Sequence, residues 1–331
     1  MEEKKLMHRR SFLAHSAMVG SGLLLAPDLF AGPGRPDSRF GGVQIGTITY
    51  SFRSMPGSVQ EILRYCVEAG VSAIELMGDA AEAFAGSPAG IMPPMQPGQQ
   101  RPAAPTPEMV KAREERAAKV REWRETVSME RFVELRRMFK KAGVSIYAFK
   151  PNALGERNSD AEVAYAMRAA KALGANSVTV ELPRDGAQTR RLGEIAARHR
   201  VYVGYHAHTQ ATDTAWDEAL AQSPYNSMNL DCGHYIAAGG QNTAETLLKL
   251  IEARHDRITS MHVKDRQTKE KGALNLEWGK GDTPLRGILL LMKEKGYRFP
   301  ATIELEYEIP KGSDAVREVA KCVAFAKSIL S

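Results

Sequence analysis

Four short stretches of the sequence carry ionisable side chains within or directly after apolar, β-branched runs. They read YHAH (205–208), DCGH (231–234), MHVKD (261–265) and IELEY (303–307). Aspartate, glutamate and histidine supply the oxygen and nitrogen atoms that bind divalent metal ions, and they also transfer protons in acid–base catalysis. One such stretch alone is weak evidence, because aspartate and glycine are common in turns and histidine has many uses.

The direction of the side chains along each run strengthens the case. Successive side chains of a strand point to opposite faces, so the apolar residues of a run mark the face that packs against helices. In MNLDCGH, Leu230 then faces outward and Asp231 inward; in ITSMHVKD, Met261 and Val263 face outward and His262 inward. Over all runs the rule directs these ionisable side chains inward: Glu75, Lys150, Glu181, His206, His208, Asp231, His262, Lys264 and Glu304.

Helical patterns separate these runs and predict the architecture. Eight β-branched runs, from VQIGTITYSF at 43–52 to ATIELEYEI at 301–309, alternate with segments whose apolar residues recur at helical spacing. Strands joined by helices run parallel, and eight such units most simply close into a single (β/α)8 barrel spanning 43–331. A doubly wound open sheet is the alternative, but TYSFRSMPGS, the first strand–helix turn, lacks a Gly-x-Gly-x-x-Gly phosphate cradle. Barrel active sites form at the C-terminal strand ends, where the inward ionisable residues fall.

A long insertion, 78–127, separates the second predicted strand from its helix. Its first half is rich in proline and predicts irregular structure, whereas 108–127 has the composition of a charged helix. Because the insertion leaves the C-terminal end of a strand, we expect a lid or a partner surface at the barrel mouth. A disordered loop is the alternative for the proline-rich half.

The N-terminal residues differ from the rest of the chain. Arg9 and Arg10 precede Phe12 and Leu13, and a mildly apolar stretch follows that is too short to span a bilayer. This pattern resembles a twin-arginine export signal, with an ordinary amphipathic leader as the alternative. The resemblance implies a signal over 1–31, a linker over 32–42, and a periplasmic mature protein without a stable membrane span.

The composition argues against several other classes of protein. With 43% hydrophobic and 25% charged residues, the 331-residue chain has the balance of a globular protein. Its net charge of +6 is spread along helices together with acidic residues, so we do not expect nucleic-acid binding. The three cysteines are far apart and odd in number, which fits neither a zinc knuckle nor a disulfide framework.

The inward residues of four strands predict a metal site. Carboxylates that converge on one buried mouth raise each other's pKa values and cost stability, and a divalent cation removes that cost. The predicted ligands are Glu181, Asp231, His262 and Glu304. Three oxygen ligands and one imidazole suit Mn²⁺ best, with Mg²⁺, Co²⁺ and Zn²⁺ as alternatives.

The order of YHAH, DCGH, MHVKD and IELEY resembles the xylose isomerase-like sugar (phosphate) isomerase/epimerase superfamily, which also includes keto-inositol dehydratases and endonuclease IV. In that superfamily Glu, Asp, His and Glu hold a divalent metal at strand ends. Asp231, His262 and Glu304 match three of these positions. Many epimerases carry the first glutamate on the fifth strand, where this chain has His206. Either Glu181 of the fourth strand takes its place, or His206 is the fourth ligand or a base.

The resemblance implies an isomerase or epimerase that acts on a free sugar or keto-sugar through an enediolate. A metal next to a carbonyl and its neighbouring hydroxyl stabilises the enediolate, and side chains remove and return the proton. The candidates for proton transfer are Glu181, Glu304 and His206. The predicted substrate contacts are His208, His234, Lys264, Glu75 and Lys150.

Three alternatives stay open at this point. A lyase or dehydratase of 3-keto-glycosides or keto-inositols would use the same metal but end in elimination, and the His-x-His of the fifth strand resembles that branch. An endonuclease would need histidine ligands after the seventh strand, where NLEWGKGD has none. A non-catalytic sugar-binding protein would use the same mouth without turnover. The expected partner is a small carbohydrate, and the sequence is compatible with a homo-oligomer.

Overall fold

The computed structural model describes residues 34–91, 93–95 and 106–331. The predicted export signal lies outside these residues, as does part of the proline-rich segment. Residues 35–331 form one compact unit. Within the segment expected to be a linker, β1 (Arg39–Phe40) pairs antiparallel with Val43 and Gln44 at the start of the first barrel strand.

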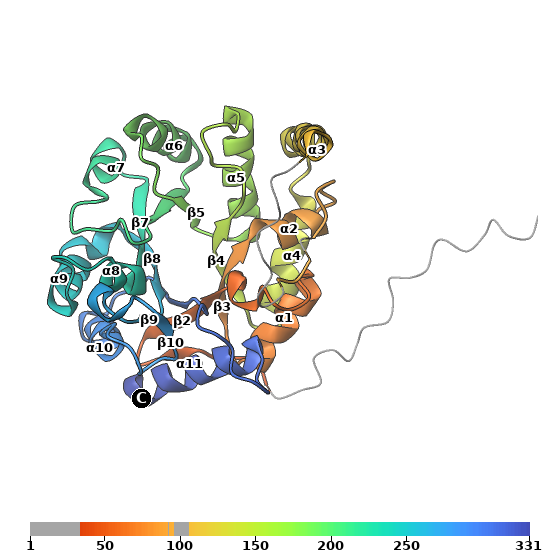
Figure 1. Cartoon of the computed structure of the whole chain (residues 1–331). Coiled ribbons are helices and arrows are strands. Elements are labelled where there is room, and N and C mark those ends of the chain that lie inside the picture. Colours follow the sequence, from red (N-terminus) through yellow and green to blue (C-terminus); the bar gives the residue numbers. More distant parts are fainter. Residues whose placement is uncertain (1–33, 92, 96–105) are drawn as a thin grey trace, which may run out of the picture. The chain divides into compact units, whose positions relative to one another are not determined.

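Eight parallel strands close into a barrel, which confirms the predicted fold (Figure 1). The circular order is β2, β11, β8, β7, β6, β5, β4, β3 and back to β2, and the pairings of β2 with both β11 and β3 close the circle. The bounds are β2 (Val43–Ile48), β3 (Ala73–Met77), β4 (Ser145–Lys150), β5 (Ser177–Glu181), β6 (Tyr202–His206), β7 (Asn226–Asp231), β8 (Ile258–Val263) and β11 (Ala301–Ile303).

Helices surround the barrel as an outer ring (Figure 1). The main helix that follows each barrel strand is, in chain order, α1 (Val59–Glu68), α4 (Glu130–Lys141), α5 (Asp160–Leu173), α6 (Gly186–His199), α7 (Asp217–Gln222), α9 (Ala244–Arg254), α10 (Leu285–Lys295) and α11 (Ala315–Leu330). Shorter elements are η1 (Thr49–Phe52), α2 (Gly78–Phe84), α8 (Cys232–Ala238), η2 (His255–Arg257), β9 (Asp265–Arg266), η3 (Lys269–Lys271) and β10 (Asn275–Leu276). Among the described helices, none combines the length and the apolar character that crossing a membrane requires.

The first helix shows how the sequence produces this ring. The Ser58 hydroxyl caps α1 by accepting a hydrogen bond from the backbone N–H of Glu61 at 3.2 Å. Ile62, Leu63 and Cys66 then recur at helical spacing and lie buried against the strands. Burial of each aliphatic side chain contributes about 1.5–3 kcal/mol, so the layer between strands and helices is the main source of stability.

The charged half of the insertion forms α3 (Pro107–Thr126), a helix as predicted. Figure 1 shows α3 beside α5 in the outer ring, so this helix does not cover the barrel centre. The buried guanidinium of Arg124 fixes it there, with Glu82 of α2 and Glu162 of α5 each 3.1 Å away. The first half of α3 is exposed on all sides. The partner surface expected here stays a prediction.

Candidate metal centre

Four side chains from four adjacent strands meet at the C-terminal end of the barrel. They are His206 of β6, Asp231 of β7, His262 of β8 and Glu304 directly after β11, and each offers an atom within 4.8 Å of the others. All four are buried. We call these four residues the buried cluster. It includes three of the four predicted ligands and replaces the fourth, Glu181, by His206.

One oxygen of the buried cluster lacks a proper partner. Asp231 Oδ1 accepts a hydrogen bond from the backbone N–H of His234 at 2.6 Å. Among the described residues no group donates a hydrogen bond of good geometry to the buried Oδ2, although Lys264 Nζ lies 3.0 Å away. His206 Nε2 lies 3.8 Å from this oxygen and His262 Nδ1 3.9 Å. Two imidazoles, the Glu304 carboxylate and this oxygen of Asp231 together form a set of ligand atoms that fits a divalent cation.

The electrostatics of the buried cluster point the same way. Burial raises the pKa of Asp231 to about 7, although Lys264 opposes this shift. Burial alone would lower the pKa of His262, but the carboxylates of Glu304 and Glu75 outweigh it and raise that pKa to about 10. Burial and the neighbouring His262 lower the pKa of His206 well below its usual value. Without a cation, the carboxylates therefore hold a proton on one imidazole of the cluster.

Glu75 lies beneath the cluster and not at the rim, which corrects its predicted role as a substrate contact. Its side chain is fully buried, and its Oε2 lies 2.9 Å from His262 Nε2. It also accepts hydrogen bonds from the Thr179 hydroxyl at 2.6 Å and the Asn229 amide at 3.1 Å. Because Glu75 stands two residues before the end of β3, its carboxylate cannot reach the mouth. It fixes the His262 ring so that Nδ1 faces Glu304 at 3.1 Å.

Glu181 lies outside the buried cluster, so its predicted place among the ligands does not agree with the structure. It is the last residue of β5, and its side chain is half exposed. Lys150 Nζ lies 2.9 Å from its Oε1, and His208 Nε2 lies 3.4 Å from its Oε2. The alternation rule gives the correct direction for the Glu181 side chain, but its carboxylate lies at the rim of the barrel. We call Glu181, Lys150 and His208 the outer group.

A second set of the same residue types lies at the mouth, and its histidine, His234, has its ring centroid 4.6 Å from that of His208. Lys264 Nζ lies 2.6 Å from Oε2 of Glu306 and 2.6 Å from Oε2 of Glu304. His234 Nε2 lies 3.9 Å from Glu306 Oε2. We call Glu306, Lys264 and His234 the inner group. Since β5 and β11 are four places apart in the eight-strand order, the two glutamates lie on opposite sides of the mouth.

Arg266 sets the proton on the His234 ring. Its Nη1 lies 2.6 Å from His234 Nδ1. A guanidinium only donates hydrogen bonds, so Nδ1 accepts and the neutral ring carries its proton on Nε2. Burial lowers the pKa of His234 to about 2, with Lys264 acting in the same direction, which keeps the ring neutral. His234 therefore presents an N–H donor towards Asp231 and Glu306.

The sequence of the chain matches one protein family over most of the barrel. A sequence model described as "Xylose isomerase-like TIM barrel" matches residues 112–326, which is more than half of the chain and contains the whole buried cluster. The chain belongs to the xylose isomerase-like TIM barrel family. No curated protein matches its sequence significantly.

Solved structures of xylose isomerase-like and related proteins share this fold. The probable 3-DHS dehydratase AsbF of Bacillus anthracis has 14% identity and a TM-score of 0.58, over 85% of this chain and 98% of that one. IOLI protein with a binding zinc atom has 16% identity and a TM-score of 0.57, over 87% and 99%. The 3-keto-D-glucoside 4-epimerase YcjR of E. coli has 13% identity and a TM-score of 0.57, over 86% and 99%. At these identities the likeness concerns the fold.

Two residues near the centre of this xylose isomerase-like barrel escape the sequence prediction. Glu306 shares the parity of Glu304, so the alternation rule could have found it, but it follows the end of β11 in irregular structure. Arg266 belongs to the short β9, which turns away from the barrel to pair with β10. Its contact with His234 joins residues 32 positions apart, and no local pattern signals it.

Proposed function

We propose that the protein is a divalent-metal-dependent isomerase or epimerase of a free sugar or keto-sugar. The observation that carries the proposal is that Glu181 and Glu306, each paired with a lysine, follow strands on opposite sides of the barrel. An epimerase removes a proton from one face of a carbon and returns one to the other face, which needs two proton carriers that face each other. We assign these two roles to Glu181 and Glu306.

The metal would be held by His206, Asp231, His262 and Glu304. When bound, a divalent ion supplies the positive charge that polarises a substrate carbonyl and stabilises an enediolate. The sequence prediction of Mn²⁺ assumed three oxygens and one nitrogen. With His206 in place of Glu181 the set has two nitrogens, which favours Co²⁺ or Zn²⁺ over Mg²⁺ and weakens the preference for Mn²⁺.

The side chains of the two groups would divide the remaining work. Glu181 takes the α-proton on one side and Glu306 returns a proton on the other. Lys150 and Lys264 each hold the glutamate of their own group through an ion pair, which orients the carboxylates before substrate binds. The Nε2–H of His234 donates to a substrate oxygen and so fixes the sugar between the two carboxylates.

Deuterium exchange tests this division. The purified protein, loaded with one metal at a time, is incubated in D₂O with free sugars and 3-keto-glycosides, and products are followed by mass spectrometry and NMR. We expect interconversion with one deuterium incorporated at the epimerised carbon. Glu181→Gln and Glu306→Gln should each block exchange from one epimer and allow it from the other. Equal loss of exchange from both epimers in both variants would contradict the two-carrier arrangement.

A lyase or dehydratase is the second candidate, and the state of His234 favours it. An N–H donor beside Glu306 can stabilise a departing hydroxyl or glycosidic oxygen after α-proton removal. The same incubation separates the two reactions, because a lyase releases water or an aglycone whereas an isomerase conserves mass apart from deuterium. Metal-dependent sugar binding without either product would instead support a non-catalytic sugar-binding protein.

We also propose export through a twin-arginine signal. The proposal rests on Arg9 and Arg10 followed by Phe12 and Leu13. Cell fractionation of the native host should place the protein in the periplasm, and the double substitution Arg9→Lys, Arg10→Lys should retain it in the cytoplasm. An unchanged distribution of the double variant would contradict this proposal.

A further inference from the structure

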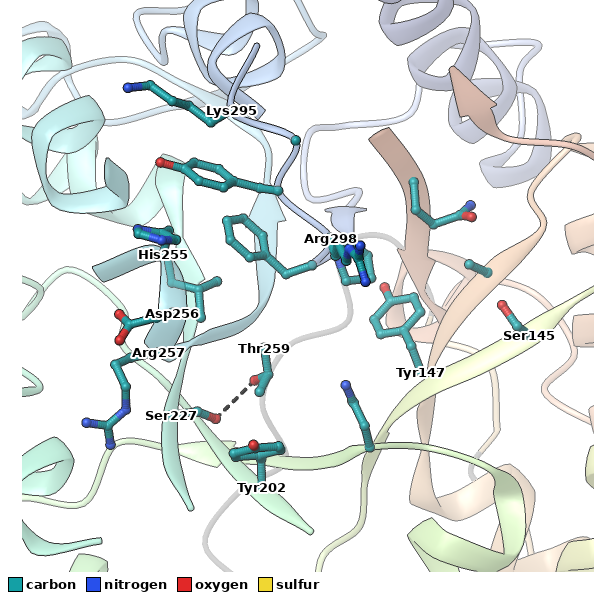
Figure 2. Close-up of a pocket in the computed structure, with 18 of the residues that line it drawn as sticks. Ser145, Tyr147, Tyr202, Ser227, His255, Asp256, Arg257, Thr259, Lys295 and Arg298 are labelled. Atoms are coloured by element: carbon teal, nitrogen blue, oxygen red, sulfur yellow. Dashed lines mark hydrogen bonds between the residues drawn. The ribbon is translucent and has the colours of Figure 1, made fainter. Parts of the chain in front are cut away.

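A cavity opens at the opposite end of the barrel from the buried cluster. It has a volume of about 610 Å³ and is lined by the N-terminal parts of several strands, including Tyr147, Tyr202 and Thr259, and by residues 295–300 before β11. Figure 2 shows these side chains arranged around the opening. The N-terminal strand ends lie away from the C-terminal ends that carry the buried cluster, so the two sites are separate.

Small residues inside the barrel explain both the cavity and its floor. A Cβ atom on Gly46 would lie 2.7 Å from the Tyr147 ring, so only glycine lets this ring cross the barrel interior. The Tyr147 hydroxyl and Thr302 Oγ1 lie 2.7 Å apart and close the floor. The small side chains of Ala73 and Ser227 also line the cavity, and they leave the space between this floor and the N-terminal opening empty.

The lining of this cavity is positively charged. It contains four cationic side chains, Arg39, Arg257, Lys295 and Arg298, and one carboxylate, Asp256, so its formal charge is +3 (4 − 1). Only Lys295 pairs with a carboxylate, that of Glu252, in the part of the chain that the structure describes. When Glu252 is counted with the lining, the formal charge falls by one and stays positive.

The two uncommitted guanidinium groups are the features that favour an anion. Within the described residues, no carboxylate lies within ion-pair distance of the Arg298 or Arg39 guanidinium. The Arg39 guanidinium donates a single hydrogen bond, to the Gly42 carbonyl. Arg257 differs, because its Nη2 already donates to three backbone carbonyls. In Figure 2, Arg298 lies near the middle of the labelled side chains. Guanidinium groups bind phosphate and similar oxyanions through paired N–H donors.

The hydroxyl groups of the wall suit a ligand that also carries hydroxyls. Ser227 Oγ donates to the Val203 carbonyl at 3.0 Å, and Thr259 Oγ1 contacts the Met228 carbonyl at 3.3 Å. The two hydroxyl oxygens also lie 3.0 Å apart, where either one can donate to the other (Figure 2). Both hydrogens are therefore engaged within the protein, and each oxygen keeps at least one lone pair to accept a hydrogen bond from a ligand. Tyr202 is 40% exposed and offers an aromatic face beside them.

We propose that this cavity binds a small phosphorylated polyol, such as a sugar phosphate. Arg298 and Arg39 hold the oxyanion, and Ser227, Thr259 and Asp256 accept hydrogen bonds from the hydroxyls. The ligand binds at the N-terminal end of the barrel, independently of the buried cluster and of the reaction there.

Titration calorimetry of the full-length protein tests the proposal. The probes are glucose 6-phosphate, inorganic phosphate and glucose, each titrated into metal-loaded and metal-free protein. We expect glucose 6-phosphate to bind about equally to both forms, more tightly than phosphate alone, and more weakly as salt is added. Glucose should show no measurable binding to the metal-free protein, in which the buried cluster cannot hold a substrate through a metal. Binding that requires the metal, or no binding of any phosphate compound, would overturn the proposal.

Matched arginine variants locate the binding. The double variant Arg39→Ala, Arg298→Ala should weaken glucose 6-phosphate binding at least tenfold, and Arg298→Lys should weaken it partly because a lysine cannot bind an oxyanion with two donors. Arg317→Ala, which removes an exposed arginine at the start of α11, is the control and should bind as the wild type does. Equal affinities in the double variant and the control would overturn the assignment. If phosphate binds as tightly as glucose 6-phosphate, the polyol half of the proposal is wrong.

Discussion

The inner and outer groups have the same three residue types but differ in burial. Lys264 of the inner group is 3% exposed, and Glu306 is 22% exposed. The corresponding values in the outer group are 19% for Lys150 and 50% for Glu181. Lys264 also contacts Asp231 and Glu304 of the buried cluster, whereas Lys150 pairs with Glu181 at the rim. Lys264 thus links Glu306 to the buried cluster, whereas the ion pair of Glu181 with Lys150 is separate from the cluster and more exposed to solvent.

Removal of the link between cluster and inner group should have the largest effect. Asp231→Asn takes one ligand from the cluster and one carboxylate from Lys264. We expect bound metal to fall from about one equivalent to a small fraction, and turnover to fall by about 10³-fold or more, because the charge that stabilises the transition state is lost. Metal analysis and initial rates measure this. Glu181→Gln is the control and should keep its metal. Equal metal loss in both variants would show that the outer group is linked to the metal as closely as the inner group is.

The two lysines should differ strongly in their effect on stability. Lys264→Met leaves three buried or half-buried carboxylates without their cation, and we expect the free energy of unfolding of the metal-free protein to fall by about 3–5 kcal/mol. Lys150→Met removes a pair at the rim and should cost about 1 kcal/mol or less. Urea unfolding in the presence of a chelator measures both. Similar costs for the two substitutions would show that burial does not distinguish the groups.

The pH dependence of the free energy of unfolding should depend on the buried cluster and not on the outer group. In the metal-free protein the pKa of His262 is raised to about 10, since Glu304 and Glu75 outweigh the effect of burial. The folded-state pKa exceeds the unfolded value of about 6.5, so this contribution to stability is present below about pH 6.5 and is lost as the pH rises towards 10. We expect the free energy of unfolding to fall by about 2 kcal/mol between pH 7 and pH 9.

A bound metal replaces that proton, so metal-loaded protein should not show the fall. Chemical unfolding at several pH values, with and without metal, makes the measurement. The same slope in both forms would argue against a proton on His262 in the metal-free state.

A smaller effect is expected from the residue beneath the cluster. Glu75→Gln keeps the volume but removes the charge that orients His262, and metal affinity should fall about 10- to 100-fold with KM for substrate little changed. Thr179→Val removes one hydrogen bond to the same carboxylate and should have a weaker effect on metal affinity. A raised KM with unchanged metal affinity would restore the substrate contact that the sequence predicts for Glu75.

The barrel could be predicted because its strands repeat one local pattern eight times. The same alternation correctly directs Asp231, His262 and Glu304 into the barrel, where the structure brings them together. It does not give the position of a side chain along the barrel axis. That position depends on where each strand begins and ends, which separates buried Glu75 from exposed Glu181.

Contacts outside the strands were beyond the sequence prediction for a different reason. Glu306 and Arg266 act through partners on other elements, Lys264 and His234, and their geometry depends on how the chain leaves β11 and β8. The cavity at the N-terminal strand ends also depends on small residues from several strands that happen to meet. Such features follow from the assembled barrel and not from any single segment.

The anchoring of α3 by Arg124 has a practical consequence for labelling and fusion. The buried side chains of α3, Val120 and Arg124, lie in its C-terminal half, and residues 107–119 are exposed. The three native cysteines are buried. A cysteine introduced at Arg113 would therefore be the one exposed thiol of the chain, on a helix of the outer ring where a dye, a spin label or a second protein lies away from the buried cluster.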